Sequence, residues 1–298
     1  MRLKPPAAFL AVLFALLLPP LPQTPADDVV RIGSFEELCA FSEKVARGEM
    51  TNARACLTAD IVATRPMRAI GTKAHMFCGK FDGQGHAVSR LVAAGPSGCQ
   101  GLFGYVGPEG VVKDVTLQKA YIAGAACAGG IAGYSAGRIE GCRVISSRVI
   151  CLGRDHYGTA AGGVAGLASG RVADCAVTLS SVRGPANTGG LCGSFHAGVM
   201  ERNAFTGVVV CTGVIEAPAG LLAGSLHGGA RMRFCAGCGA ALTFLSSYAG
   251  GAAGGVFSES SIVGCVTGGP DNRGAARLAA ALAHEEGPRD TNSQHFLP

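Results

Sequence analysis

Short apolar stretches alternate with polar residues along most of the chain, and glycine-rich turns separate them. In "GGIAGYSAGRIEGCRVI" (129–145), Ile139 is followed by Cys142 and then by Val144. The stretch "GGVAGLASGRVADCAVT" (162–178) repeats this order 33 residues later. A period of two is the pattern of a β-strand and not of a helix. Each unit therefore predicts several short strands separated by turns.

The glycine-rich part of this unit recurs six times, at intervals of 27 to 33 residues. The last glycines of the six copies, called the anchor glycines below, are Gly104, Gly133, Gly166, Gly193, Gly224 and Gly254. A period of about 30 residues suits one coil of a β-helix, whereas a propeller blade needs about 40 or more. The pattern predicts an all-β fold, a right-handed three-sided parallel β-helix of about six to seven coils over residues 57–268.

Stacked coils place equivalent residues directly above one another. In each unit, the residue three places after the apolar residue of the second strand should therefore form one internal column with its equivalents. This column is called the corner ladder below. Its members are Val115, Cys142, Cys175, Asn203, Cys235 and Cys265. We expect the cysteines to act there as small buried hydrophobic residues. Glycine is expected to recur where a coil corner needs positive φ or a close backbone approach.

The first 26 residues have the layout of a secretory signal peptide. Two bases precede an apolar run at 7–18, and a cleavage site is predicted after Ala26. A run of twelve is short for a membrane span, which needs about 20 apolar residues. The predicted location is secreted or cell-surface, with no membrane span in the mature chain.

Both ends of the solenoid are expected to carry short helical caps. Residues 27–56 predict a strand and then an amphipathic helix, with Ser34 as N-cap and Glu37 completing a capping box. Residues 269–298 predict a second short helix, at 275–286, followed by a polar tail. Such helices would cover the core that a terminal coil exposes.

Four further motifs stand before or at the first anchor glycine: "LTADI" at 57–61, "AIG" at 69–71, "FDGQGHAVSRL" at 81–91 and "GLFG" at 101–104. They resemble the motifs of the GLUG-motif proteins, which are secreted or surface-attached bacterial repeat proteins. With the later copies, the resemblance extends over about residues 32–267. It implies a right-handed β-helix in an exported protein of adhesin-like character, and it implies no defined reaction.

The composition excludes several classes of function. With 46 Gly, 13 Cys and 48% hydrophobic residues, the chain is too apolar for a disordered linker and lacks a collagen period. The net charge is +5, charged residues make up 15%, and the bases occur singly. We therefore expect no nucleic-acid partner, no polybasic membrane patch and no cofactor. A glycan or a protein at the cell surface is the expected partner.

Catalytic β-helices would need carboxylates at matched positions in neighbouring coils. Asp114 and Asp174 each precede a ladder residue, but Gly141, Arg202 and Phe234 occupy the equivalent positions in other coils. The predicted function is therefore an exported, non-enzymatic, adhesin-like interaction module. The alternative is a carbohydrate-active enzyme of the polysaccharide lyase or glycoside hydrolase type.

Cysteine and histidine offer the remaining candidate chemistry. Cys192, His196 and His227 lie near their anchor glycines in adjacent units and could ligate zinc or copper. The pair in "CAGC" (235–238) lacks the second half of a zinc site, and "DGQGH" (82–86) reads as a turn. The ladder thiols are expected to be mainly free, whereas disulfides are expected among Cys39, Cys56, Cys78 and Cys99.

Overall fold

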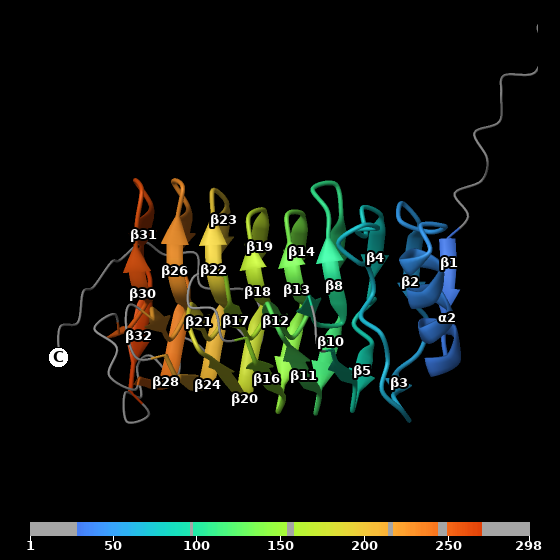
Figure 1. The fold of residues 1–298 in the computed structure, drawn as a ribbon, viewed down its shortest axis with the longest axis horizontal. Helices are drawn as coiled ribbons and strands as arrows, with labels where there is room; N and C mark the ends of the chain where they lie inside the picture. The colour runs from blue at the N-terminus through green and yellow to red at the C-terminus, as the bar shows by residue number, and fades with distance from the viewer. Residues whose placement is uncertain (1–28, 96–97, 154–157, 214–216, 244–248, 270–298) are drawn as a thin grey trace, which may run out of the picture.

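The parallel β-helix predicted from the sequence is confirmed. The computed structural model describes residues 29–95, 98–153, 158–213, 217–243 and 249–269. They form a β-solenoid of about eight turns in which parallel strands of successive coils stack along one axis (Figure 1). In this part of the chain, α2 is the one helix. Residues 1–26 and the helix predicted at 275–286 lie outside the described residues.

The strands form four parallel sheets. The nine-stranded sheet A contains β1 (Val29–Ile32), β2 (Arg54–Leu57), β4 (Lys80–Asp82), β9 (Val111–Lys113), β14 (Arg138–Glu140), β19 (Arg171–Ala173), β23 (Val199–Glu201), β27 (Arg231–Arg233) and β31 (Ser261–Val263). The six-stranded sheet C contains β8 (Phe103–Val106), β13 (Ala132–Ser135), β18 (Ala165–Ala168), β22 (Cys192–His196), β26 (Ala223–His227) and β30 (Ala253–Val256). The six-stranded sheet D contains β7 (Cys99–Gln100), β12 (Cys127–Gly129), β17 (Ala160–Gly162), β21 (Thr188–Gly189), β25 (Ala219–Gly220) and β29 (Ala249–Gly250).

The eleven-stranded sheet B has two arms that meet at a corner. Its first arm contains β3 (Ile61–Val62), β5 (Ala87–Ser89), β10 (Thr116–Gln118) and β15 (Arg143–Ile145). Its second arm contains β6 (Val92–Ala94), β11 (Tyr121–Gly124) and β16 (Arg148–Cys151). The arms merge in the long strands β20 (Ala176–Gly184), β24 (Ala204–Cys211) and β28 (Ala236–Thr243), and β32 (Val266–Gly268) ends the sheet. One full coil, such as β12 to β16, thus contains five short strands, where the sequence pattern indicated three.

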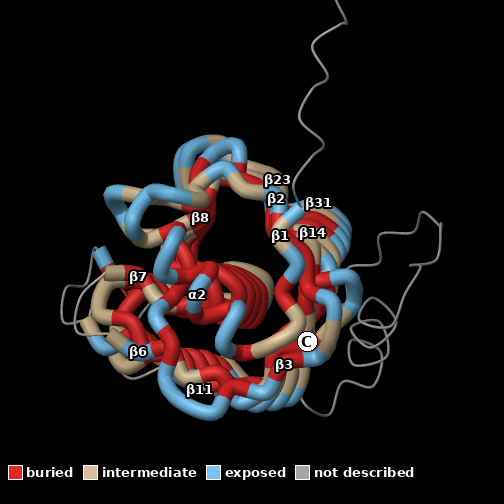
Figure 2. The backbone as a smooth tube through the Cα atoms, turned by 90° about the vertical axis from the view of Figure 1, so that its right-hand side faces the viewer, coloured by how far each residue is buried: buried red, intermediate tan, exposed pale blue. Residues whose placement is uncertain are grey.

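The solenoid begins at Val29, upstream of the predicted start at residue 57, because β1 pairs in parallel register with β2. Helix α2 (Phe35–Ala46) follows β1, and the predicted capping box between Ser34 and Glu37 is present. The buried face of α2 lies over the end of the main core (Figures 1 and 2). Phe41 contacts Phe77 edge-on, with 6.0 Å between the ring centroids. The predicted N-terminal helix is confirmed as a cap.

The residues of the corner ladder lie inside the described coils, and their surroundings are more polar than the sequence indicated. Cys142, Cys175, Asn203 and Cys235 are buried, and Cys265 is partly buried in the last coil. The Cys175 thiol donates to the carbonyl oxygen of Ala173 at 3.2 Å. Ladder side chains therefore satisfy backbone groups at the corner as well as filling space.

The residue before each ladder member turns the corner in the left-handed conformation, with φ between 52° and 63°. These residues are Asp114, Gly141, Asp174, Arg202, Phe234 and Gly264. Only two of them are glycine, so positive φ at these corners does not require glycine. The five anchor glycines from Gly133 to Gly254 have no positive φ. A Cβ at Gly166 would lie 2.8 Å from the nitrogen of Ala128 and 2.8 Å from the oxygen of Gly133. Of the two reasons expected for glycine, close backbone approach is therefore the one that operates at the anchors.

All thirteen cysteines are free thiols. The disulfides expected among the four N-terminal cysteines are therefore absent from the structure. Cys39 lies on α2 and Cys56 lies on β2, whereas Cys99 has Cys127 as its direct neighbour in the strand register. Stacking between coils thus places Cys127 beside Cys99, whereas the sequence suggested Cys39, Cys56 or Cys78 as its partner.

Candidate ligand-binding groove

The structure brings two of the three predicted metal ligands together. His196 and His227 are register partners on β22 and β26, and their rings stack with centroids 4.7 Å apart. His227 also stacks on Phe257 at 4.8 Å. Burial lowers the pKa of His196, and burial together with the charge of His196 lowers the pKa of His227. The pair is therefore a half-buried aromatic stack that favours neutral imidazoles.

Cys192 does not join this pair, because its side chain is fully buried in the main core. Burial raises the pKa of its thiol to about 12. Across the described residues, no group of three His, Cys, Asp or Glu side chains could hold a metal ion. Cys235 also lies in the main core, whereas the Cys238 thiol donates to the carbonyl oxygen of Gly269 at 3.4 Å. The side chains of the two cysteines in "CAGC" thus lie in different surroundings and do not form a pair.

The two aspartates considered as catalytic groups lie in exposed corner positions. The guanidinium of Arg202 donates to both carboxylate oxygens of Asp174, each at 2.7 Å. Lys113 lies 3.3 Å from Asp114. Neighbouring ion pairs on sheet A join Arg171 to Glu201 at 2.6 Å and to Glu140 at 3.2 Å. Since basic side chains pair these carboxylates, the outer face of sheet A is an ion-pair network and shows no catalytic dyad.

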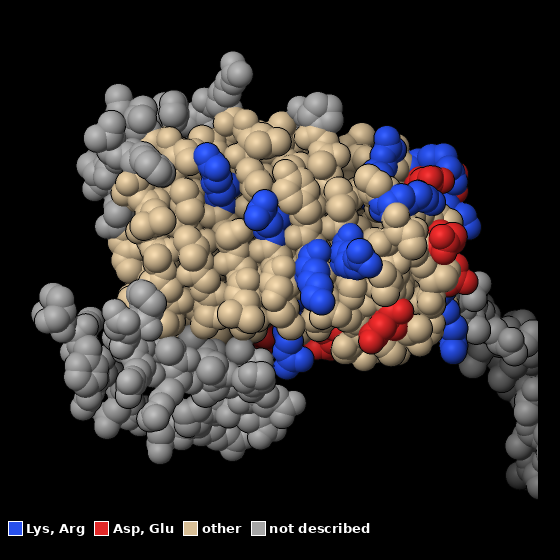
Figure 3. All heavy atoms as spheres, turned by 90° about the horizontal axis from the view of Figure 1, so that it is seen from below, with Lys and Arg blue, Asp and Glu red and all other residues tan. Residues whose placement is uncertain are grey.

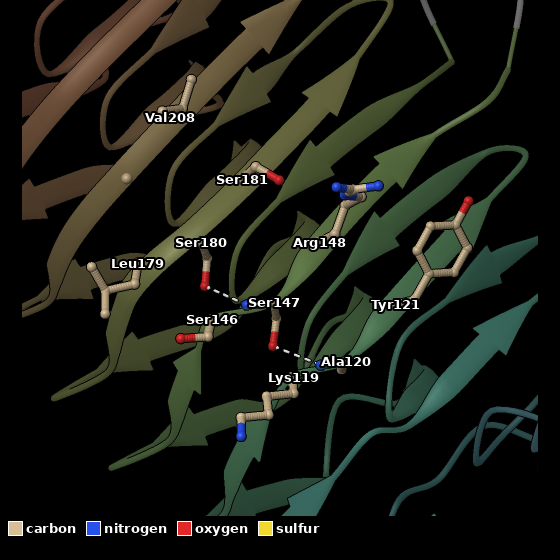
Figure 4. A pocket seen from close by; sticks show the side chains of 11 residues that line it. Lys119, Ala120, Tyr121, Ser146, Ser147, Arg148, Leu179, Ser180, Ser181 and Val208 are labelled. Carbon is tan, nitrogen blue, oxygen red and sulfur yellow. Dashed lines mark hydrogen bonds between the residues drawn. The ribbon is translucent and has the colours of Figure 1, made fainter.

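A groove of about 670 Å³ lies on the outside of sheet B, where its two arms meet (Figure 4). One wall is a row of register neighbours from four successive coils: Tyr121, Arg148, Ser181 and Val208. The other wall carries residues in the left-handed conformation, Lys119, Ser146 and Leu179, with φ of 53°, 48° and 51°. The groove therefore runs along the solenoid axis and offers similar positions coil after coil.

The floor of the groove is a ladder of serines whose hydrogen bonds are satisfied internally. Ser147 Oγ accepts from the backbone nitrogen of Ala120 at 3.0 Å and donates to the oxygen of Ile145 at 2.8 Å. Ser180 Oγ accepts from the nitrogen of Ser147 at 3.0 Å (Figure 4). A ligand would therefore meet the walls, where an aromatic ring, two bases and two further serines face the opening.

Sheet B carries basic residues without acidic ones. Its described strands contain no Asp or Glu, and their bases are Arg143, Arg148 and Arg183. Arg90 and Lys119 add two bases at the corner between the arms. Within the described residues, none of these five side chains makes an ion pair. Figure 3 shows Lys and Arg over this face, with Asp and Glu near the N-terminal end and along one edge.

Sequence reasoning missed this groove because the bases stand singly along the chain, on different coils. A usable signal was present in the stretches that follow each ladder residue. Those at 143–151 and 176–184 contain arginine but no carboxylate, whereas the sheet A strands mix both signs.

The fold and the groove define the class of the protein, a parallel β-solenoid with an open lateral groove. No family model matches the chain, and no curated protein matches its sequence. Among solved structures, the fold is similar to that of a "putative immunoglobulin A1 protease" from Bacteroides ovatus, with a TM-score of 0.60 and 18% sequence identity. The match covers 80% of this chain and 83% of the other. At this identity the likeness concerns the fold alone. No helix of the described residues is long and apolar enough to span a membrane.

Proposed function

We propose that the protein is an exported, non-enzymatic, adhesin-like module that binds an extended acidic glycan along the groove of sheet B. The observation that carries the proposal is a grooved face whose described strands contain no carboxylate and whose five bases make no ion pair within the described residues; two of these bases, Lys119 and Arg148, line the groove itself. The predicted signal peptide and the resemblance to GLUG-motif proteins support export. The bases favour an anionic partner over a neutral one.

The groove residues match the chemistry of a uronate-containing polysaccharide. The Arg148 guanidinium presents paired donors to a carboxylate, and the Lys119 ammonium supplies a second charge. Tyr121, which is 39% exposed, offers an aromatic face on which a sugar ring can pack. Successive coils repeat at about 4.8 Å, so one long chain can contact several coils at once.

The alternative is an eliminative polysaccharide lyase, because bases that neutralise a uronate would also assist removal of its neighbouring proton. Glycoside hydrolysis is less well supported, since it uses two carboxyl groups about 5 to 9.5 Å apart. Among the described residues, the lining of the groove contains neither Asp nor Glu.

Removal of two groove charges should weaken binding to polygalacturonate by about tenfold or more, since a loss of 1.4 kcal/mol is about tenfold. The test variant is Lys119→Ala with Arg148→Ala, measured by calorimetry at low salt. The matched control is Arg138→Ala with Arg231→Ala, which removes the same charge from sheet A. We expect the control to bind like the native chain. Equal losses in both variants, or no binding by the native chain, would contradict the proposal.

A further inference from the structure

A second hollow, of about 440 Å³, opens beside β7 and reaches a cysteine. Its lining includes Cys99, Lys73 and Tyr105. This cleft shares no residue with the groove of sheet B, and the proposed glycan binding does not use it. Cys99 is 93% buried by the protein, so the cleft is its route to solvent.

The neighbouring coil places a second thiol directly beside Cys99. Cys127 on β12 is its partner in the parallel register, and the two cysteines pack with Ala160 in a small cluster apart from the main core. Paired parallel strands lie about 4.8 Å apart. Disulfides form at Cα separations of about 4.4 to 6.8 Å, so the backbone spacing suits a bridge.

The surroundings of the two thiols make them chemically different. A hydrogen bond from Cys127, with further help from Tyr105 and Lys73, lowers the pKa of Cys99 to about 7. The same hydrogen bond, together with burial, raises the pKa of Cys127. A reactive thiolate beside a resolving thiol is the arrangement of redox-responsive cysteines.

We propose that Cys99 and Cys127 form a thiol–disulfide exchange site that reacts with a small-molecule disulfide through this cleft. The Cys99 thiolate attacks one sulfur of the disulfide, a mixed disulfide forms, and one thiolate leaves. The Cys127 thiol then loses its proton to the solvent and attacks the Cys99 sulfur, which expels the second thiolate. The two cysteines lose two electrons and two protons, and the small disulfide is reduced to two thiols.

The stacked thiols of the corner ladder provide an internal comparison. Cys142 and Cys175 also lie in adjacent coils, but both are fully buried in the main core. Neither lines the cleft beside β7. Exchange should therefore be selective for the pair on sheet D and leave the ladder reduced.

The test is incubation of the full folded chain with oxidised glutathione, followed by alkylation and mass spectrometry. We expect loss of two hydrogens, mapped to a Cys99–Cys127 bridge, and a rate that rises as the pH passes about 7. Cys127→Ser should trap one glutathione on Cys99, Cys99→Ser should abolish the reaction, and Cys142→Ser should leave it unchanged. A native chain that forms no bridge, or reacts equally at the ladder cysteines, would overturn the proposal. Glycan binding by that chain would be unaffected, so the two proposals fail separately.

Discussion

Gly193→Ala is expected to lower the unfolding free energy by about 3 kcal/mol or more, the upper end of the cost of overpacking. Gly193 is the anchor glycine of β22 and has no positive φ, so only space forbids a side chain there. An added Cβ would lie 2.5 Å from the oxygen of Asn187, 2.6 Å from the nitrogen of Ala161 and 2.6 Å from the oxygen of Gly166. All three atoms belong to the backbones of packed strands and turns. Sheets C and D would have to separate to admit a methyl group.

The measurement is the urea midpoint of unfolding, followed by circular dichroism. The control is Gly269→Ala, since a Cβ at Gly269 would have no atom of the described residues within 4 Å and φ there is not positive. We expect its stability to change by less than about 0.5 kcal/mol. A Gly193→Ala midpoint equal to that of the control would refute close backbone approach as the reason for the anchor glycines.

Asn203→Leu is expected to lower the unfolding free energy by about 2 to 5 kcal/mol, because it leaves two buried backbone groups without partners. Asn203 is fully buried in the corner ladder. Its Oδ1 accepts from the nitrogen of Cys175 at 2.8 Å, and its Nδ2 donates to the oxygen of Val172 at 2.9 Å. Leucine has a similar volume but can make neither bond.

Asn203→Cys is the informative companion variant. In other coils, ladder thiols bond to the equivalent partners: Cys265 Sγ accepts from the nitrogen of Cys235 at 3.4 Å, and the Cys235 thiol donates to the oxygen of Met200 in the preceding coil at 3.8 Å. We therefore expect the cysteine variant to retain more of the native stability than the leucine variant. Equal stability of the leucine and cysteine variants in thermal unfolding would show that side-chain volume alone determines stability at this ladder position.

The repeat made the solenoid predictable, because a column of cysteines and an anchor glycine mark the same place in successive coils. The five-strand coil was not predictable, since most of its strands have only two to four residues and are too short to show a period. The left-handed corners were hidden as well, because Arg202 and Phe234 carry no turn signal in the sequence. Stacking imposes that conformation on them.

The candidate sites were harder to predict than the fold, because their members come from different coils at positions outside the repeated motif. Cys99 lies five residues before Gly104, whereas Cys127 lies six residues before Gly133. Because the two offsets differ by one residue, alignment on the anchor glycines does not place Cys99 beside Cys127. The strand register does. His196 and His227 have the same offset from their anchor glycines, and their stacking follows from that shared offset.

Incubation of the folded chain with polygalacturonate and with a neutral glucan of equal length tests the central claim most directly. Binding and chain length are to be measured on the same samples, the latter as new reducing ends and as absorbance of unsaturated sugar products. We predict saturable binding to the acidic polymer that weakens with salt, weaker binding to the neutral one, and no shortening of either. Release of oligosaccharides would show that the protein is an enzyme. Equal binding of both polymers would show that the charges of the groove do not determine binding.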